Sequence, residues 1–163
     1  MTEFIAINTP EEFDSLAELA SEIWHEHFTS IIGEAQVEYM LEHFQSSAAM
    51  QEQVRNDGYS YYCVCDGGEV CGYCAICPHE DYMYLSKFYM RADFRRKGIG
   101  RKMMDFIAGE TKKAGLPKIR LNVNKYNFAI DVYKRLGFSI TADEVNDIGN
   151  GFVMDDYVME KNV

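Results

Sequence analysis

The basic stretch from Arg95 to Gly100 constrains the fold of this chain more than any other segment. It follows a β-rich run at 82–90 and opens a helical pattern, which predicts a strand that passes through a tight loop into a helix. Gly98 and Gly100 would let the backbone turn sharply and approach a ligand closely. The first turn of the helix would present unpaired N–H groups and the positive end of its dipole, so an anion is the expected ligand.

The spacing of this loop departs from two common nucleotide-binding motifs. A dinucleotide fingerprint needs a glycine three residues after Gly100, where this chain has Met103. A P-loop needs Lys followed by Ser or Thr after its last glycine, where Arg101 and Lys102 stand. The loop therefore predicts an anion site that matches neither of these motifs.

The loop resembles instead the pyrophosphate loop of the GNAT superfamily of N-acetyltransferases. That pattern is Gln or Arg, two residues, Gly, one residue, and Gly or Ala, and Arg95, Gly98 and Gly100 satisfy it. Further along the chain, the segment 124–138 resembles the family's other signature, which is an Asn, an Ala, a Tyr four residues after the Ala, and then Gly-Phe. The resemblance covers the chain well from about Tyr61 to its end, and residues 1–58 more loosely. The helical N-terminus followed by β-rich runs looks most similar to the branch that includes bacterial polyamine acetyltransferases.

The resemblance implies a co-substrate, a reaction and a set of site residues. The co-substrate would be acetyl-CoA, and an amine would attack its thioester directly in a ternary complex. The loop from Arg95 to Arg101 would hold the pyrophosphate, the end of the preceding strand would pair with the pantetheine amides, and Tyr133 would be the general acid. Asn127 matches the asparagine that bonds the pantetheine, with Asn124 as the alternative. The cofactor-binding residues implied in this way are Phe88, Tyr89, Met90, Arg95, Arg96, Lys97, Gly98, Ile99, Gly100, Arg101 and Asn127.

The resemblance does not assign the general base. Many family members carry a glutamate on the strand before the loop, at a position that aligns with Ser86, and a serine alone cannot act as that base. Glu80, Asp81, or a water chain that leads to Glu26 or Glu34 could take its place. The departure at Ser86 also leaves open a module that binds acyl-CoA without turnover.

Hydrophobic periodicity and turn residues predict a single α/β domain over residues 1–163. We expect a mixed, mostly antiparallel central sheet flanked by helices, with a parallel and splayed strand pair at the cofactor site. Thr9 with Glu12 predicts the start of the first helix, and Asp66-Gly67-Gly68 predicts a hairpin. The last strand is expected to close the sheet. The predicted strands are 4–7, 61–65, 70–76, 82–90, 118–123, 138–142 and 151–159, and the predicted helices begin near residues 10, 34, 47, 99 and 127.

Length and composition limit the class of protein. With 163 residues and a hydrophobic fraction of 47%, the chain has enough apolar material for one full core. It contains no apolar run long enough to span a bilayer and no N-terminal stretch that resembles a signal peptide. We therefore expect a cytoplasmic protein without a membrane partner. The sequence does not decide between a monomer and a homodimer.

The net charge of −10 is unevenly distributed. Residues 91–102 contain six basic residues and one acidic residue, whereas residues 1–58 contain twelve acidic residues and one basic residue, Arg55. The acidic N-terminal part argues against a nucleic-acid partner and favours a cationic one. We therefore expect the acetyl acceptor to be a small cationic amine, such as a polyamine. A protein N-terminus or a protein lysine is the alternative.

Two further patterns have a metal or nucleophile interpretation that we do not favour. Cys71-x-x-Cys74-x-x-Cys77 has the spacing of a zinc site, but residues three apart on a predicted strand point to opposite faces, and no second pair completes a tetrahedral site. We expect buried, reduced thiols and no metal. Nothing basic lies near Cys74 in the sequence to lower its pKa, so that thiol is a poor nucleophile. His27 falls on the apolar face of the first predicted helix, where we expect a hydrogen-bonded core histidine rather than a ligand.

Overall fold

The chain begins with a short strand and three consecutive helices, and capping residues explain where the first helix starts. In the computed structural model, which describes residues 1–163, β1 spans Thr2–Ala6 and α1 spans Pro10–Ile32. The Thr9 hydroxyl accepts a hydrogen bond from the Glu12 N–H at 3.2 Å, and the Glu12 carboxylate accepts one from the Thr9 N–H at 2.9 Å. This is the predicted capping box. Helix α1 ends at Gly33, and α2 (Glu34–Phe44) and α3 (Ser47–Asn56) follow.

The next three strands form an antiparallel meander. The strands β2 (Ser60–Asp66), β3 (Glu69–Pro78) and β4 (Met83–Met90) pair consecutively, and β1 pairs with β2 at the edge of the sheet. Gly67 and Gly68 have φ angles of +61° and +84°, which a two-residue hairpin turn of this kind requires. The hairpin predicted at these glycines is therefore confirmed.

The second half of the chain adds a parallel strand pair and a long hairpin. Helix α4 (Ile99–Lys113) returns the chain from β4, so that β5 (Lys118–Asn124) pairs with β4 in parallel. Helix α5 (Ala129–Arg135) and the strands β6 (Ser139–Gly149) and β7 (Phe152–Asn162) complete the fold. The seven strands form one sheet in the order β1-β2-β3-β4-β5-β7-β6. The predicted class, α/β with a mixed and mostly antiparallel sheet, is confirmed.

Two features of the C-terminal hairpin differ from the prediction. Strand β6 continues to Gly149, well beyond its predicted end at Ala142, and β7 lies between β5 and β6 rather than at the edge of the sheet. The reason is that β6 is an edge strand whose residues are almost all exposed. Such a strand lacks the alternation of apolar and polar residues that marks a half-buried strand in a sequence. The exposed run 143–147, which is polar except for Val145, therefore concealed the rest of the strand.

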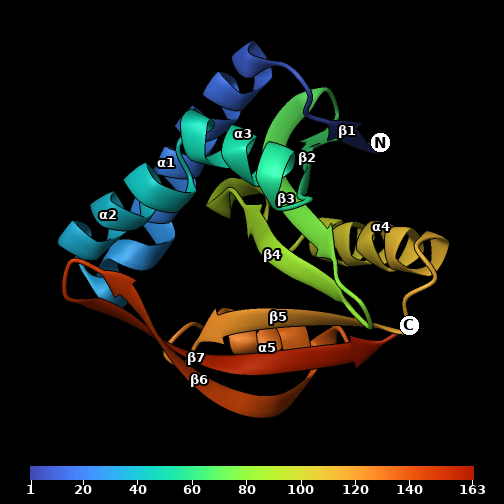
Figure 1. Ribbon diagram of the computed structural model, residues 1–163. Coiled ribbons are helices and arrows are strands. Elements are labelled where there is room, and N and C mark those ends of the chain that lie inside the picture. The colour runs from blue at the N-terminus through green and yellow to red at the C-terminus, as the bar shows by residue number, and fades with distance from the viewer.

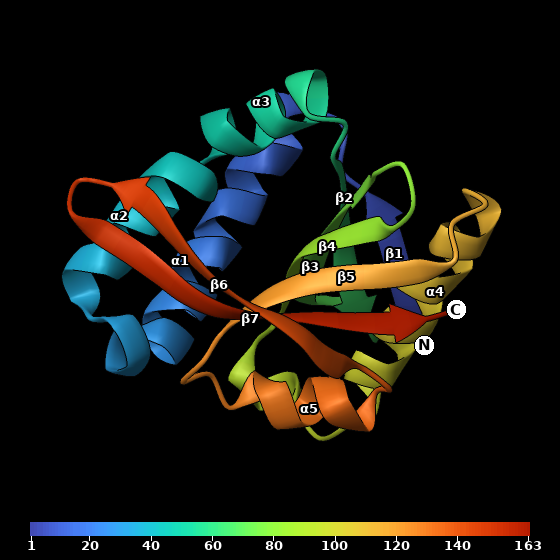
Figure 2. The same ribbon diagram turned by 60° about the horizontal axis from the view of Figure 1, so that its bottom comes forward.

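Helices cover both faces of the sheet and give the protein two hydrophobic cores (Figures 1 and 2). Helices α1, α2 and α3 cover one face, where Trp24 and Phe28 of α1 pack against Tyr89 of β4. Helices α4 and α5 cover the other face, where side chains such as Met103 pack against β5. None of the helices combines the length and apolarity that a bilayer span requires. Because packing holds the central strands from both sides, their ends keep defined positions.

The β6–β7 hairpin reaches across to α2 and contacts it at its tip (Figure 2). The Tyr39 hydroxyl of α2 donates a hydrogen bond to the Ile148 carbonyl oxygen at 2.6 Å. The Gln36 side-chain amide donates one to the Val153 carbonyl oxygen at 3.0 Å. The end of the hairpin and α2 thus face each other on the side of the sheet that α1, α2 and α3 cover.

A substitution at Gly72 tests how closely β3 and β4 approach each other where β4 ends. A Cβ at this position would lie 2.4 Å from the Tyr89 carbonyl oxygen and 3.2 Å from the Met90 Cα, both of which are main-chain atoms. We expect Gly72→Ala to lower the free energy of unfolding by about 1–3 kcal/mol, measured by urea denaturation. The control is Gly109→Ala in α4, where a Cβ meets nothing within 4 Å. That control should be about 1 kcal/mol more stable than the wild type. Equal stability of Gly72→Ala and wild type would contradict the close approach.

Candidate active site

The sheet opens between β4 and β5, and this opening is where the site is built (Figure 1). Only two residue pairs join the strands, Met83 with Ile119 and Tyr84 with Arg120. Beyond Tyr84 the strands diverge, so the edge of β4 that faces β5 has no strand partner. Its main-chain N–H and C=O groups are therefore free to bond an extended ligand. The predicted splayed pair is present.

A β-bulge lies at the point where the strands diverge. Ala75 pairs with Lys87 and Ile76 pairs with Leu85, which leaves Ser86 of β4 without a partner on β3. An extra residue of this kind bends its strand and increases its twist. Ser86, which the resemblance aligns with the family glutamate, is thus the bulge residue.

The loop between β4 and α4 has the geometry of an anion site. Gly98 is left-handed with φ of +78°, and Arg96 is a non-glycine residue with φ of +64°. No side chain caps the N-terminus of α4, so its first N–H groups remain without protein partners. Ile99, at the first position of the helix, is buried in the core and fixes the helix start.

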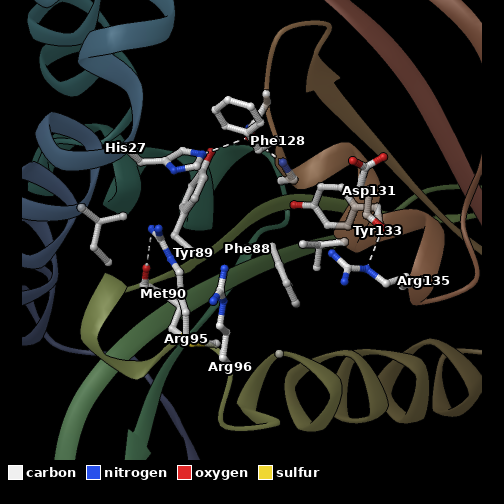
Figure 3. A pocket seen from close by; sticks show the side chains of 15 residues that line it. His27, Phe88, Tyr89, Met90, Arg95, Arg96, Phe128, Asp131, Tyr133 and Arg135 are labelled. Atoms are coloured by element: carbon white, nitrogen blue, oxygen red, sulfur yellow. Dashed lines mark hydrogen bonds between the residues drawn. The ribbon is translucent and has the colours of Figure 1, made fainter.

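This loop forms one wall of a cavity of about 710 Å³, which we call the loop cavity (Figure 3). Arg95 and Arg96 enter it from the loop and Arg135 from α5, so the cavity is rich in positive charge. It brings together eight of the predicted site residues, which are Phe88, Tyr89, Met90, Arg95, Arg96, Gly100, Asn127 and Tyr133. Four others, Lys97, Gly98, Ile99 and Arg101, do not line it. Lys97, for example, lies with its Nζ 5.0 Å from the centre of the Phe94 ring.

His27 of α1 is a cavity residue that the sequence prediction misplaced. It was expected in the core, but it is only half-buried and lines the loop cavity. The expected hydrogen bond is present, because its Nε2 lies 3.0 Å from the Asn127 Oδ1. The partner is a hundred positions away in the sequence, so helical periodicity alone could not reveal this contact. The other lining residues that the prediction missed are Ile23, Phe128, Ala129, Asp131, Val132 and Arg135.

The hydrogen bonds of Asn127 define the orientation of its amide and the tautomer of His27. The Ala129 N–H can only donate, and it lies 2.9 Å from the Asn127 Oδ1, so the side-chain oxygen must occupy this position. His27 Nε2 is then the donor in the second bond to the same oxygen. Burial is the main cause that lowers the pKa of His27, which favours the neutral ring at pH 7. The Nδ2 group of Asn127 keeps its two hydrogens for a ligand.

Tyr133 of α5 presents its hydroxyl to the cavity (Figure 3). The side chain is buried between the rings of Phe88 and Phe138, each with its centre 5.7 Å away. Burial is the sole cause that raises its pKa above the ordinary value for tyrosine. The hydroxyl is therefore protonated at neutral pH and can act as a donor but not as a base.

A second cavity of about 250 Å³ lies on the α1–α3 side of the sheet, and we call it the sheet cavity. The helices contribute apolar side chains such as Met40 and Phe44, and the hairpin contributes Asn146 and Ile148. The sheet contributes a polar floor that includes Tyr84, Ser86, Lys87, Asn122, Asn124 and Asp156. Four residues line both cavities, so the two spaces adjoin at Phe88, Tyr89, Asn127 and Tyr133.

Two buried ionisable groups of the sheet cavity were not predicted from the sequence. Burial lowers the pKa of Lys87 to about 7, and burial is the main cause that raises the pKa of Asp156 to about 6. Neighbouring residues of a regular strand point to opposite faces. The bulge breaks this alternation, so that Ser86 and Lys87 both face the α1–α3 side of the sheet. The acids that the prediction offered as bases lie elsewhere, because Glu26, Glu34, Glu80 and Asp81 are exposed and line neither cavity.

The cysteines are not part of either cavity. All five thiols are free, and burial raises the pKa of Cys74 to about 12. Such a thiol is protonated at neutral pH and is a poor nucleophile. No group of three or more His, Cys, Asp or Glu side chains is arranged to hold a metal ion.

Comparisons with known proteins identify the family and agree with the fold. The chain matches the model of the acetyltransferase (GNAT) family over residues 14–138, whereas no curated protein sequence matches it. It is similar to the crystal structure of PaiA N-acetyltransferase from Thermoplasma acidophilum in complex with coenzyme A, with a TM-score of 0.81, 21% identity, and 100% of this chain and 99% of that chain covered.

Two other similar structures have the same fold. The ribosomal-protein-S18-alanine N-acetyltransferase from Escherichia coli matches with a TM-score of 0.69 and 18% identity, with 100% of this chain and 94% of that chain covered. Aminoglycoside 6′-acetyltransferase type Ii matches with a TM-score of 0.69 and 21% identity, with 99% and 96% covered. The family match spans most of the sequence, includes the loop before α4 and reaches the second predicted signature. This chain therefore belongs to the GNAT family of acetyltransferases.

Proposed function

We propose that this acetyltransferase transfers the acetyl group of acetyl-CoA to the primary amine of a small molecule. The observation that carries the proposal is the sheet cavity of about 250 Å³, which adjoins the loop cavity at Tyr133 and Asn127. Its polar floor and apolar helical walls suit a compact amine with a few hydrogen-bonding groups. The amine would reach the thioester at the junction of the two cavities.

The walls of the sheet cavity favour a small acceptor over a polypeptide. Helix α2 and the β6–β7 hairpin face each other and are joined by the Tyr39–Ile148 hydrogen bond. A peptide that binds in extended form needs a groove through which its chain can continue. Acetylation of a protein N-terminus or lysine is the second candidate, and it would require the hairpin to move away from α2.

The cavity gives less support to a long polycation. None of the twelve acidic residues of the segment 1–58 lines the sheet cavity. The charged residues that do line it are one lysine and one aspartate, Lys87 and Asp156. A short amine with one or two ammonium groups fits this balance better than a polyamine that depends on many carboxylates.

The loop cavity has the parts that acetyl-CoA requires. The Arg95 and Arg96 side chains and the uncapped N-terminus of α4 would bind the pyrophosphate, as anions bind at helix N-termini. The free edge of β4 at Phe88–Met90 would hydrogen-bond the pantetheine amides, and Asn127 Nδ2 would donate to the same arm. The bound co-substrate supplies an activated acetyl thioester. A main-chain N–H of the β4 edge would stabilise negative charge on the thioester oxygen during attack, an effect worth about 3 to 4 kcal/mol in other acyl-transfer enzymes.

Tyr133 is the general acid in this proposal. Its raised pKa keeps the proton on the hydroxyl until a stronger base forms, and the departing thiolate is that base. Its position at the junction of the two cavities puts the hydroxyl next to the place where the C–S bond would break.

Binding of acetyl-CoA and its dependence on Arg96 test the assignment of the loop cavity. We expect saturable binding of acetyl-CoA by calorimetry and none of ATP or NAD at the same concentration. Arg96→Ala should raise the Kd for acetyl-CoA about tenfold, because a charge-assisted hydrogen bond to phosphate is lost, and the loss should shrink at high salt. Arg55→Ala, an exposed arginine of α3, is the matched control and should leave Kd unchanged. If ATP binds as tightly as acetyl-CoA, the assignment is wrong.

A tyrosine substitution tests the general acid. Tyr133→Phe should lower kcat at least about 100-fold, the low end of general acid catalysis, with the Kd for acetyl-CoA within about threefold of the wild type. Tyr126→Phe is the control, because Tyr126 lies in the same segment but is 73% exposed and lines neither cavity. Equal turnover by Tyr133→Phe and wild type would remove Tyr133 from the mechanism.

A panel of acceptors separates the candidate functions. The free thiol produced from acetyl-CoA is measured with 2-phenylethylamine, spermidine, kanamycin, tetraalanine and an N-terminally blocked peptide that contains one lysine. We expect kcat/KM for at least one of the three small amines to exceed that of both peptides at least about tenfold, because the cavity excludes a continuing chain. A preference for a peptide would favour the protein-directed function. Binding of acetyl-CoA without turnover of any amine would favour a non-catalytic module.

A further inference from the structure

The sheet cavity contains one carboxylate, that of Asp156, which forms no ion pair within the protein. Asp156 lies in the middle of the β5-β7-β6 part of the sheet, directly opposite Asn124 on one side and Glu144 on the other. It is only 5% exposed, and its Oδ1 atom is buried without a hydrogen-bond partner. A buried carboxylate oxygen without a donor is costly, so its presence in a cavity wall points to a ligand that donates a proton or hydrogen bond.

The cations near Asp156 are committed to other groups. Lys87, the other charged residue of the cavity, donates to the Phe44 carbonyl oxygen at 2.8 Å and to the Gln53 side-chain oxygen at 2.9 Å. Lys125 forms ion pairs with two other carboxylates, at 3.0 and 3.3 Å. Asp156 is therefore the one ionised group of the cavity that is free to pair with an ammonium ion.

Asp156 is also a candidate for the general base, which the sequence does not assign. Ser86, the bulge residue of β4, has no group that can take a proton from an ammonium ion at neutral pH. Lys87 Nζ already bonds the Phe44 carbonyl oxygen, the Gln53 side-chain oxygen and the Tyr61 hydroxyl, so it has no position left for a proton from the acceptor. Asp156 lines the cavity that adjoins the general acid at Tyr133, and it is an acceptor of protons.

We infer that Asp156 binds the ammonium group of the acceptor amine in the sheet cavity and receives the proton that the nitrogen must lose before it attacks. The inference rests on the proposed function and deepens it, since it assigns the base and requires the acceptor to enter as a cation. The acceptor is thereby a protonated primary amine. Its ammonium group loses its hydrating water on binding and forms an ion pair with a single buried carboxylate.

The transfer is balanced as follows. One proton passes from the ammonium nitrogen to the Asp156 carboxylate, and the freed lone pair forms the C–N bond to the acetyl carbon. The C–S bond breaks, and its electron pair leaves on sulfur. Tyr133 gives its proton to that sulfur and regains one from the nitrogen. The products are the N-acetyl amide, the free thiol of coenzyme A and one proton, which Asp156 releases to solvent.

The charges around Asp156 set the pH at which it can work. Burial is the main cause of its raised pKa of about 6, and the carboxylates of Glu144 and Asp155 raise it further. Asn122 and Lys125 act in the opposite direction. The carboxylate is ionised above about pH 6, so the base should be lost as the pH falls through this value. The other titratable groups that face the cavity or adjoin it are His27, Tyr59, Tyr84, Lys87, Tyr89 and Tyr133.

The test compares two isosteric substitutions on adjacent residues of β7. Asp156→Asn should lower kcat/KM for the panel amine that the wild type acetylates fastest at least about 100-fold, because the base is removed. Its Kd for acetyl-CoA should stay within about threefold of the wild type, and its melting temperature should not fall, because a buried unpaired charge is removed. Asp155→Asn is the matched control, since Asp155 is paired with Lys125 and does not line the cavity. It should keep kcat/KM within about threefold.

The pH profile separates Asp156 from its titratable neighbours. The wild-type profile of kcat/KM should show a break near pH 6, and Asp156→Asn should lose that break while His27→Gln keeps it. A second measurement needs no variant. Calorimetry in two buffers of different ionisation enthalpy gives the number of protons released when the amine binds. Binding of the same amine to the wild type loaded with coenzyme A should release a fraction of one proton near pH 6, because the ammonium ion favours ionised Asp156.

Each outcome has a distinct meaning. If the wild type acetylates an amine, and Asp156→Asn does so at the same rate with the break at pH 6 retained, the inference is wrong and the proposed function stands. Absence of proton release on amine binding also contradicts the inference. If the wild type acetylates no amine of the panel, the proposed function fails and the role of Asp156 fails with it.

Discussion

The early end of pairing between β4 and β5 is the constraint on which the rest of the site depends. Two parallel strands that stayed in register would bond each other along their whole length and leave no main-chain group for a ligand. Here the pairing stops at Tyr84, and the bulge at Ser86 bends β4 away from its neighbour. The loop cavity, the sheet cavity and the residues between them, Asn127 and Tyr133, are all arranged around this opening. The two hydrophobic cores hold it open from either face of the sheet.

The parts of the fold and site that the sequence predicts well are those that short segments determine. The capping box at Thr9 and the hairpin at Gly67 and Gly68 each depend on four or fewer neighbouring residues, and both are present. The loop from Arg95 to Gly100 is similar, because the left-handed turn at Gly98 and the uncapped helix that follows depend on neighbouring residues. The family match over 14–138 agrees with the resemblance drawn from this loop and from the segment after β5. The individual roles of these residues stay predictions until they are measured.

The features that the sequence did not reveal depend on contacts between distant segments. His27 is a cavity residue because α1 meets the start of α5, and helical periodicity cannot distinguish that position from the core. Asp156 is buried because β7 lies between β5 and β6, an order that no local pattern encodes. Strand β6 escaped prediction beyond Ala142 because an exposed edge strand has no apolar face. Lys87 shares the inner face of β4 with Ser86 only because the bulge shifts the alternation by one residue.

In the proposed function, the determinants of the two substrates lie in different parts of the chain, because the β6–β7 hairpin lines the sheet cavity and not the loop cavity. The loop cavity, which we propose for the co-substrate, is built mainly from the end of β4, the loop and α5, whereas the walls of the sheet cavity come from α1, α2, α3 and the β6–β7 hairpin. Mutations at the hairpin tip, where Tyr39 meets Ile148, can reshape the acceptor space without touching the arginines of the loop. With the two substrates assigned as we propose, a lineage with this architecture would acquire new acceptors by drift in its outer segments while the acetyl donor stays the same.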